Sequence, residues 1–147
     1  MKLRFRRRDL VAAYLAATVF SGLPSTLHAL ATGADALEAT RAAGAMLAPG
    51  ATSTAALVAA AAVVHPAVSL FWTAVFAFLL PRRGVVFWAI LGSLAVALLD
   101  LLVIAPAFFP SVAALPFRPQ LADHLMWGAL LGGTLHWRMR RRQGHGD

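Results

Sequence analysis

The stretch VVFWAILGSLAVALLDLLVIAPAF, residues 85–108, decides the fold, because it holds a single charged residue, Asp100. A membrane-spanning helix needs about 20 mainly apolar residues to cross about 30 Å of hydrocarbon. Three further stretches meet this requirement, at about residues 10–30, 57–80 and 121–137, of which the last is the shortest. The sequence therefore predicts an all-α protein, a polytopic four-helix transmembrane bundle that forms one domain over residues 1–147.

The composition agrees with a chain whose solvent is the lipid bilayer. Hydrophobic residues make up 60% of the chain and charged residues 13%, whereas soluble domains usually carry about 25% charged residues. The absence of cysteine excludes disulfides, thiolate metal sites and a cysteine nucleophile. The net charge of +7 is not accompanied by a nucleic-acid-binding motif or a Gly-rich phosphate loop, so we expect no nucleic acid partner.

The basic residues predict the orientation. Eleven of the 13 Lys and Arg residues fall in three short segments, at residues 2–8, 82–83 and 138–142. Four alternating spans place all three segments on one side of the membrane, and cytoplasmic flanks are those that carry excess Lys and Arg. The two other connections hold one basic residue each, Arg41 and Arg118. We therefore predict a multi-pass protein of the bacterial plasma (inner) membrane with both termini inside, an N-in/C-in topology.

The first apolar stretch has a second interpretation. A basic start, an apolar core and small residues at Ala29 and Ala31 are also typical of a cleaved signal peptide. Cleavage would leave three spans with the new N-terminus outside. The apolar stretch is longer than the usual core of a signal peptide, which favours a retained span.

Ionisable residues within the predicted spans indicate a candidate site. Such residues are rare and usually functional, because a charge at mid-membrane costs at least about 2.5 kcal/mol on insertion scales. At about 1.5 Å per residue, His65, Asp100 and His124 all lie about 22 Å from the cytoplasmic ends of their helices. His28 lies slightly higher, and Asp123 borders the same layer. The sequence predicts an intramembrane polar cluster on the outer-leaflet side, made of His28, His65, Asp100 and His124.

Small and polar residues also recur at helical spacing along each span, which predicts that these faces meet inside the bundle. In the first stretch they are Tyr14, Thr18, Ser21, Ser25 and His28. Gly128 and Gly132 in the last stretch form a small-xxx-small pair, which is typical of closely packed membrane helices. The Gly/Ala-rich connection at residues 32–50 predicts a short surface helix.

Three functions fit the predicted cluster. In the first, Asp100 pairs with His65 or His124 and fixes the helix order of a structural or accessory protein. In the second, the cluster passes protons or holds a cation in a small proton, cation or solute transporter that acts as a homo-oligomer. In the third, His65, Asp100 and His124 hold a divalent metal, or two His residues ligate haem. The sequence does not identify a cofactor, because no two His residues fall at i, i+3 or i, i+4.

Catalysis has little support in the sequence. Ser21, Ser25 and Ser69 lie in spans that also carry His residues, but no nucleophile motif surrounds them. We therefore name no catalytic residue.

Two stretches are similar to a known group of proteins. They are SGLPSTLHALATG at residues 21–33 and LPFRPQLADHLMWG at residues 115–128. Both resemble a group of small, uncharacterised four-span bacterial membrane proteins seen in high-GC genomes. The resemblance implies an inner-membrane four-helix bundle and implies no activity.

Overall fold

The structure is a computed structural model that describes residues 5–143, and within them it is helical, with no strand. The all-α class predicted from the sequence is confirmed. The elements in chain order are α1 Arg7–Phe20, α2 Leu23–Thr32, α3 Glu38–Ala45, α4 Thr54–Leu79, α5 Val85–Leu99, the π-helix η1 Asp100–Ile104, α6 Ala105–Phe108, α7 Pro110–Ala113 and α8 Phe117–Gln143.

Three helical segments are long and apolar enough to cross a membrane. They are Arg7–Thr32, Thr54–Leu79 and Val85–Phe108, with mean hydropathies of 1.5, 1.9 and 2.4. Large apolar side chains such as Phe71 and Phe87 are exposed on their surfaces. Apolar surface of this extent marks a membrane or protein contact in a natural protein, and segments of this length and composition suggest a membrane protein.

The stretch predicted at residues 121–137 lies inside α8, which is not among these three segments. At about 1.5 Å per residue, the 27 residues of α8 extend about 40 Å. The helix packs against α1, α2 and α5, and its residues Trp127, Leu131 and Leu135 are buried. α8 is therefore covered largely by protein, and its surface has less need of apolar residues than the surfaces of the other long helices.

The stretch predicted at residues 10–30 is not one continuous helix. It is divided into α1 and α2 at Ser21 and Gly22. Pro24, in the first turn of α2, has no N–H, and its ring excludes the carbonyl of Phe20 from the helical position four residues earlier. The helix therefore stops and restarts, which leaves backbone groups near the break in need of other partners.

The stretch predicted at residues 85–108 also changes its geometry part-way. α5 is followed by a π turn in which the N–H of Ala105 bonds to the carbonyl of Asp100, five residues earlier. Pro106 comes next and has no N–H to donate. Single π turns inside α-helices are frequent at functional sites. Asp100 thus lies at the irregular point of this segment.

The remaining predicted elements are present with small shifts. The stretch predicted at residues 57–80 is α4, which begins at Thr54 and continues through Pro66. The short helix predicted within residues 32–50 is α3. Its Gly44 is buried directly against the backbone of α4, where a Cβ would have no room.

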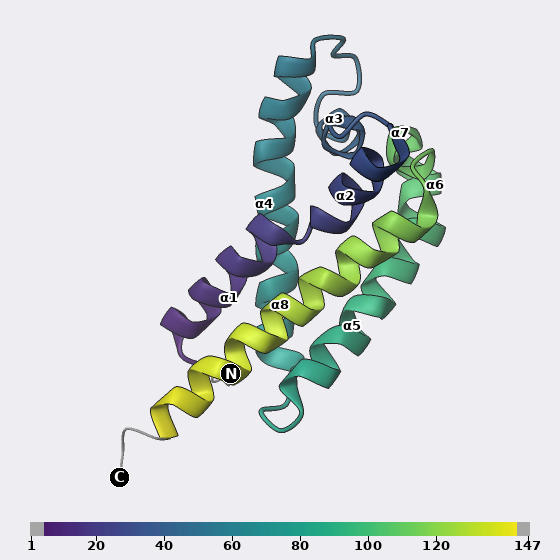
Figure 1. Cartoon of the computed structure of the whole chain (residues 1–147). Helices are drawn as coiled ribbons and strands as arrows, with labels where there is room; N and C mark the ends of the chain where they lie inside the picture. The colour runs from purple at the N-terminus through teal and green to yellow at the C-terminus, as the bar shows by residue number, and fades with distance from the viewer. Residues whose placement is uncertain (1–4, 144–147) are drawn as a thin grey trace.

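The helices are arranged with two distinct ends (Figure 1). α1 begins, α8 ends and the turn between α4 and α5 lies at one end, whereas α2, α3, α6 and α7 gather at the other. The described parts of the three basic segments therefore share one end of the protein. Gly84 allows the turn between α4 and α5, because its φ of 65° lies in the left-handed region.

Close packing of α5 on α8 forms the centre of the protein. A Cβ placed on Gly128 would lie 2.5 Å from Cβ of Ser93 and 2.7 Å from the carbonyl oxygen of Ala89. A Cβ on Gly132 would lie 2.8 Å from Cβ of Ala89. The predicted close contact through Gly128 and Gly132 is therefore confirmed. Phe76 of α4 joins this centre by an edge-to-face contact with Trp127.

The substitution Gly128→Ala is expected to lower the unfolding free energy by about 1–3 kcal/mol, because the added methyl group overlaps α5. Gly133→Ala is the matched control, since nothing lies within 4 Å of a Cβ at that position. Thermal unfolding of both variants in detergent, followed by circular dichroism, measures the difference. Equal melting temperatures for the two variants would contradict the close contact.

Candidate functional site

The break between α1 and α2 leaves backbone groups that polar residues of other helices contact. The carbonyls of the last turn of α1 lack partners within their own helix. One of them, the carbonyl of Thr18, faces the ring of His65 on α4, and the distance from Nε2 to the oxygen is 2.9 Å. Because a carbonyl only accepts hydrogen bonds, Nε2 of His65 carries the proton in this contact.

Asp123 of α8 supplies the partner for the start of α2. The backbone N–H of Ser25 donates to Oδ1 of Asp123 at 2.9 Å. This N–H belongs to the first turn of α2, where no carbonyl of the same helix can accept it. A carboxylate at a helix N-terminus is also favoured by the helix dipole. Asp123 therefore caps α2 from another helix, a role that its sequence neighbours do not indicate.

Ser69 of α4 connects three helices. Nε1 of Trp127 donates to Oγ of Ser69 at 2.7 Å, and the hydroxyls of Ser69 and Thr18 lie 2.6 Å apart. The side chain of Ser69 is buried, so these bonds replace those that water would otherwise make. The hydroxyl of Tyr14 donates to the carbonyl of Pro66 at 3.3 Å and adds a second link between α1 and α4.

Asp100 and His124, two members of the predicted polar cluster, form an ion pair. Nε2 of His124 lies 3.3 Å from Oδ2 of Asp100, and Nδ1 lies 2.9 Å from the carbonyl of Gln120. The hydroxyl of Ser93 donates to the backbone carbonyl of His124. Both ring nitrogens thus face oxygen atoms. Both contacts are hydrogen bonds when the ring carries two protons, or when the ring carries one proton at Nδ1 and the carboxyl group of Asp100 carries the other. The side chains of Asp100 and His124 are 30% and 24% exposed, so the pair lies near the surface of the bundle.

The four residues predicted as one cluster do not converge on one point. Asp100 contacts His124, while His65 contacts the backbone of α1 instead. His28 is exposed and lines a cavity of about 190 Å³ at the end of the bundle where α2, α3 and α8 meet. Within residues 5–143, the side chain of His28 has no hydrogen-bond or ion-pair partner. His28 lies apart because the break at Gly22 sets α2 off from α1.

The geometry gives no support to a metal centre in the described part of the chain. No three His, Asp or Glu side chains among residues 5–143 come together in a group that could hold a metal ion. His124 already directs one nitrogen to a carboxylate and the other to a carbonyl. His65 directs Nε2 to a carbonyl as well.

The connection between α2 and α4 is stabilised by a surface ion pair. Nη2 of Arg41 lies 2.7 Å from Oδ2 of Asp35, and the N–H of Leu37 donates to Oδ1 of the same carboxylate. The Leu37 N–H and the Arg41 guanidinium together hold the pKa of Asp35 below its ordinary value. These contacts fix the start of α3 beside the cavity lined by His28.

Asp9 is a polar centre that sequence reasoning did not identify. Its side chain is 5% exposed and is bound by two arginines of α8, Arg138 and Arg142. Nε of Arg138 lies 2.9 Å from Oδ1 of Asp9. The sequence hints at this contact in two places. Asp9 is a single acidic residue after a run of arginines, and Arg138 and Arg142 lie four residues apart, on one face of a helix, near the other terminus. The excess of Lys and Arg on cytoplasmic flanks is a sufficient explanation for these arginines in the sequence, so nothing there indicates that they pair with Asp9.

Comparison of the chain with protein-family models, with curated proteins and with solved structures found no match. The function therefore has to be inferred from the chain's own residues.

Removal of the Asp123 carboxylate by Asp123→Ala is expected to lower the unfolding free energy by about 1–2 kcal/mol, as loss of a helix cap does. Hydrogen exchange of backbone amides near Ser25 should accelerate. Glu38→Ala is the control, because this exposed carboxylate has no side-chain hydrogen bond within residues 5–143, and it should change stability by less than about 0.5 kcal/mol. Unchanged exchange at residues 23–28 in Asp123→Ala would refute the capping role.

Proposed function

We propose that the chain is a structural or accessory protein of the bacterial plasma (inner) membrane, a four-span N-in/C-in bundle whose polar layer holds its helices together. The observation that carries this proposal is the bonding of His65 and Asp123 to backbone groups exposed by the break between α1 and α2. In hydrocarbon, such groups must find partners in neighbouring helices. The resemblance to small four-span bacterial proteins belongs to the same proposal.

The length and position of α8 support a fourth span. Its extent of about 40 Å exceeds the hydrocarbon thickness of about 30 Å. The middle of α8, from Leu125 to Trp137, contains no Asp, Glu, Lys or Arg. The start of α1, the α4–α5 turn and the end of α8, which hold the described parts of the three basic segments, lie at one end of the protein (Figure 1). This agrees with the excess of positive charge on cytoplasmic flanks.

The bonding pattern supports the structural role over a solute site. Ser69 joins α4 to α1 and α8, while Ser93 joins α5 to α8. Interhelical hydrogen bonds in membrane proteins contribute about 0.6 kcal/mol each on average. Several such bonds at one depth are enough to select one helix order. A polar layer whose groups are already bonded to one another has few free groups left for a solute.

Proton or cation transport by an oligomer is the second candidate, and one observation favours it. The Asp100–His124 pair is partly exposed and lies at the π turn of its helix. Exchangeable protons, a partly exposed ion pair and an irregular helix are features of proton pathways in membranes. In this alternative, Asp100 and His124 carry the proton, and copies of the chain associate as a homo-oligomer to complete the path.

The absence of native cysteine makes the proposed topology directly testable by single cysteines. Ser111→Cys and Ser53→Cys, both at exposed positions on the α3 and α7 side, should react with an impermeant maleimide on intact spheroplasts. Arg83→Cys and Gln143→Cys should react only after lysis, because the proposal places both inside. Labelling of Gln143→Cys but not of Arg83→Cys in intact spheroplasts would mean that α8 does not cross, and the four-span proposal would fail.

Proton flux separates the two candidate functions. We expect liposomes with the wild-type protein to carry no more flux, under an imposed potential and read by a pH-sensitive dye, than liposomes with Asp100→Asn. Asp100→Asn keeps the shape of the side chain and removes its ionisation, so it would abolish a relay through His124. Wild-type flux well above that of a folded Asp100→Asn protein would replace the structural proposal by transport.

A further inference from the structure

A cavity of about 190 Å³ lies where α2, the start of α3 and the start of α8 meet. Pockets for drug-sized ligands usually measure about 300–1,000 Å³, so this one suits a smaller group. Alanine and proline side chains form part of its wall. The remaining lining is polar, and it comes from Ser25, His28, Thr32, Asp35, Glu38 and Gln120.

Two ionisable side chains of this lining lack a partner. Neither His28 nor Glu38 makes a side-chain hydrogen bond or an ion pair within residues 5–143, and both are exposed. Asp35 differs, because Arg41 and the N–H of Leu37 already bind its carboxylate. Glu38 therefore brings to the cavity a negative charge that no ion pair of the described chain offsets.

The two hydroxyl groups of the lining have already committed their protons to the backbone. The hydroxyl of Ser25 donates to the carbonyl of Gly22 at 3.2 Å, and the hydroxyl of Thr32 donates to the carbonyl of His28 at 2.9 Å. A hydroxyl holds a single proton, so each oxygen retains only lone pairs for a ligand. Ionised carboxylates also only accept hydrogen bonds. The cavity thus offers a ligand a negative charge and mainly hydrogen-bond acceptors.

We propose that this cavity binds a primary ammonium group on a short hydrocarbon stem. Such a group has three N–H donors and no acceptor, and like the side chain of lysine it is cationic at neutral pH. Glu38 offsets its charge, and the unprotonated nitrogen of a neutral His28 ring accepts one of its hydrogen bonds. The alanine and proline wall contacts the stem. A metal ion fits less well, because no three His, Asp or Glu side chains among residues 5–143 form a group that could hold one.

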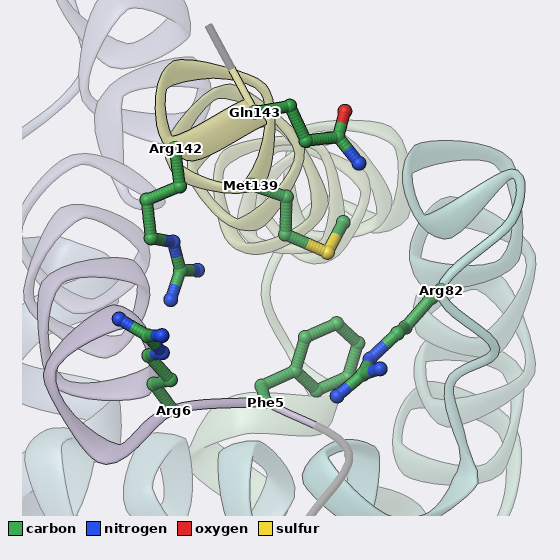
Figure 2. Close-up of a pocket in the computed structure, with 6 residues that line it drawn as sticks. All are labelled: Phe5, Arg6, Arg82, Met139, Arg142 and Gln143. Carbon is green, nitrogen blue, oxygen red and sulfur yellow. The ribbon is translucent and has the colours of Figure 1, made fainter. Parts of the chain in front are cut away.

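The cavity at the basic end of the protein has the opposite lining. It measures about 240 Å³ and is lined by Phe5, Arg6, Arg82, Met139, Arg142 and Gln143 (Figure 2). Guanidinium groups donate hydrogen bonds and cannot accept them, and they repel a cation. We therefore expect a primary ammonium group at the cavity of His28 and Glu38 and not at the basic end.

Butylamine and 1-butanol are a matched pair of probes, because they share one hydrocarbon chain and only the amine is charged. The full-length protein in detergent is titrated with each probe, and binding is measured by saturation-transfer NMR against empty micelles. Glu38→Gln removes the charge of the carboxylate, and Glu38→Asp keeps it on a shorter side chain. His28→Ala removes the ring from the lining, while His136→Ala is its control, because His136 is exposed and does not line the cavity.

We expect butylamine to bind more tightly than 1-butanol, and we expect Glu38→Gln to weaken its binding roughly 10-fold or more, since charge-assisted hydrogen bonds are the stronger ones. Glu38→Asp should weaken it less, His28→Ala by about threefold, and His136→Ala not measurably. Equal binding of the two probes, or wild-type affinity in Glu38→Gln, would overturn the site. If Glu38→Gln fails to fold, His28→Ala against His136→Ala decides the question.

The ammonium group has two sources, a soluble amine and the ethanolamine headgroup of a phospholipid. Native mass spectrometry with phosphatidylethanolamine and phosphatidylcholine separates them, because the quaternary nitrogen of choline has no N–H to donate. A preference for phosphatidylethanolamine that Glu38→Gln abolishes assigns the lipid, and no preference beside intact butylamine binding assigns a soluble amine. Binding in detergent does not depend on the orientation in the membrane, which cysteine labelling tests, so failure of this inference and failure of the proposed topology are distinguishable.

Discussion

A backbone N–H or C=O without a partner costs several kcal/mol in hydrocarbon, where no water can replace the missing bond. The break between α1 and α2 creates such groups part-way along this helical segment. His65 of α4 donates a hydrogen bond to the carbonyl of Thr18, and the carboxylate of Asp123 of α8 accepts one from the N–H of Ser25. Once Pro24 interrupts the first helix, α4 and α8 are therefore held at defined heights beside it. Two contacts of the polar layer, those of His65 and Asp123, thus satisfy backbone groups beside the break.

The same constraint explains why the central helix is the least apolar of the long ones. α8 packs against α1, α2 and α5, so its surface touches protein over most of its length. Where it touches α5, Gly128 and Gly132 leave room for the backbone of the other helix. Where it touches the broken helix, it contributes Asp123, and toward Asp100 it contributes His124. A helix with these contacts gains from polar and small residues that would be unfavourable against lipid.

Much of this architecture could be predicted because apolar runs and basic flanks reflect the solvent around each segment. Counting residues along the helices from the same end predicted His65 or His124 as the partner of Asp100, and the structure brings His124 to it. That counting assumes straight helices, so it failed to place His28, which lies beyond the break at Gly22. The π turn could not be predicted either, because its apolar residues suit an α-helix equally well. Asp9 was missed because charge near a membrane surface is usually solvated, and its burial depends on how α8 ends.

Two carboxylates attach the broken first helix to α8, one near each end. Asp9 of α1 is bound by Arg138 and Arg142 of α8, while Asp123 of α8 binds the backbone of α2. Each bond holds one half of the broken helix, so α1 and α2 are both fixed to α8 although they are not continuous. α4 lacks an ion pair to the other helices within residues 5–143 and is joined to α1 and α8 chiefly through Ser69 and hydrogen bonds to backbone groups. The attachment of α4 to α1 and α8 therefore depends on weaker bonds than those that hold α1 and α2, because neutral hydrogen bonds are weaker than charge-assisted ones.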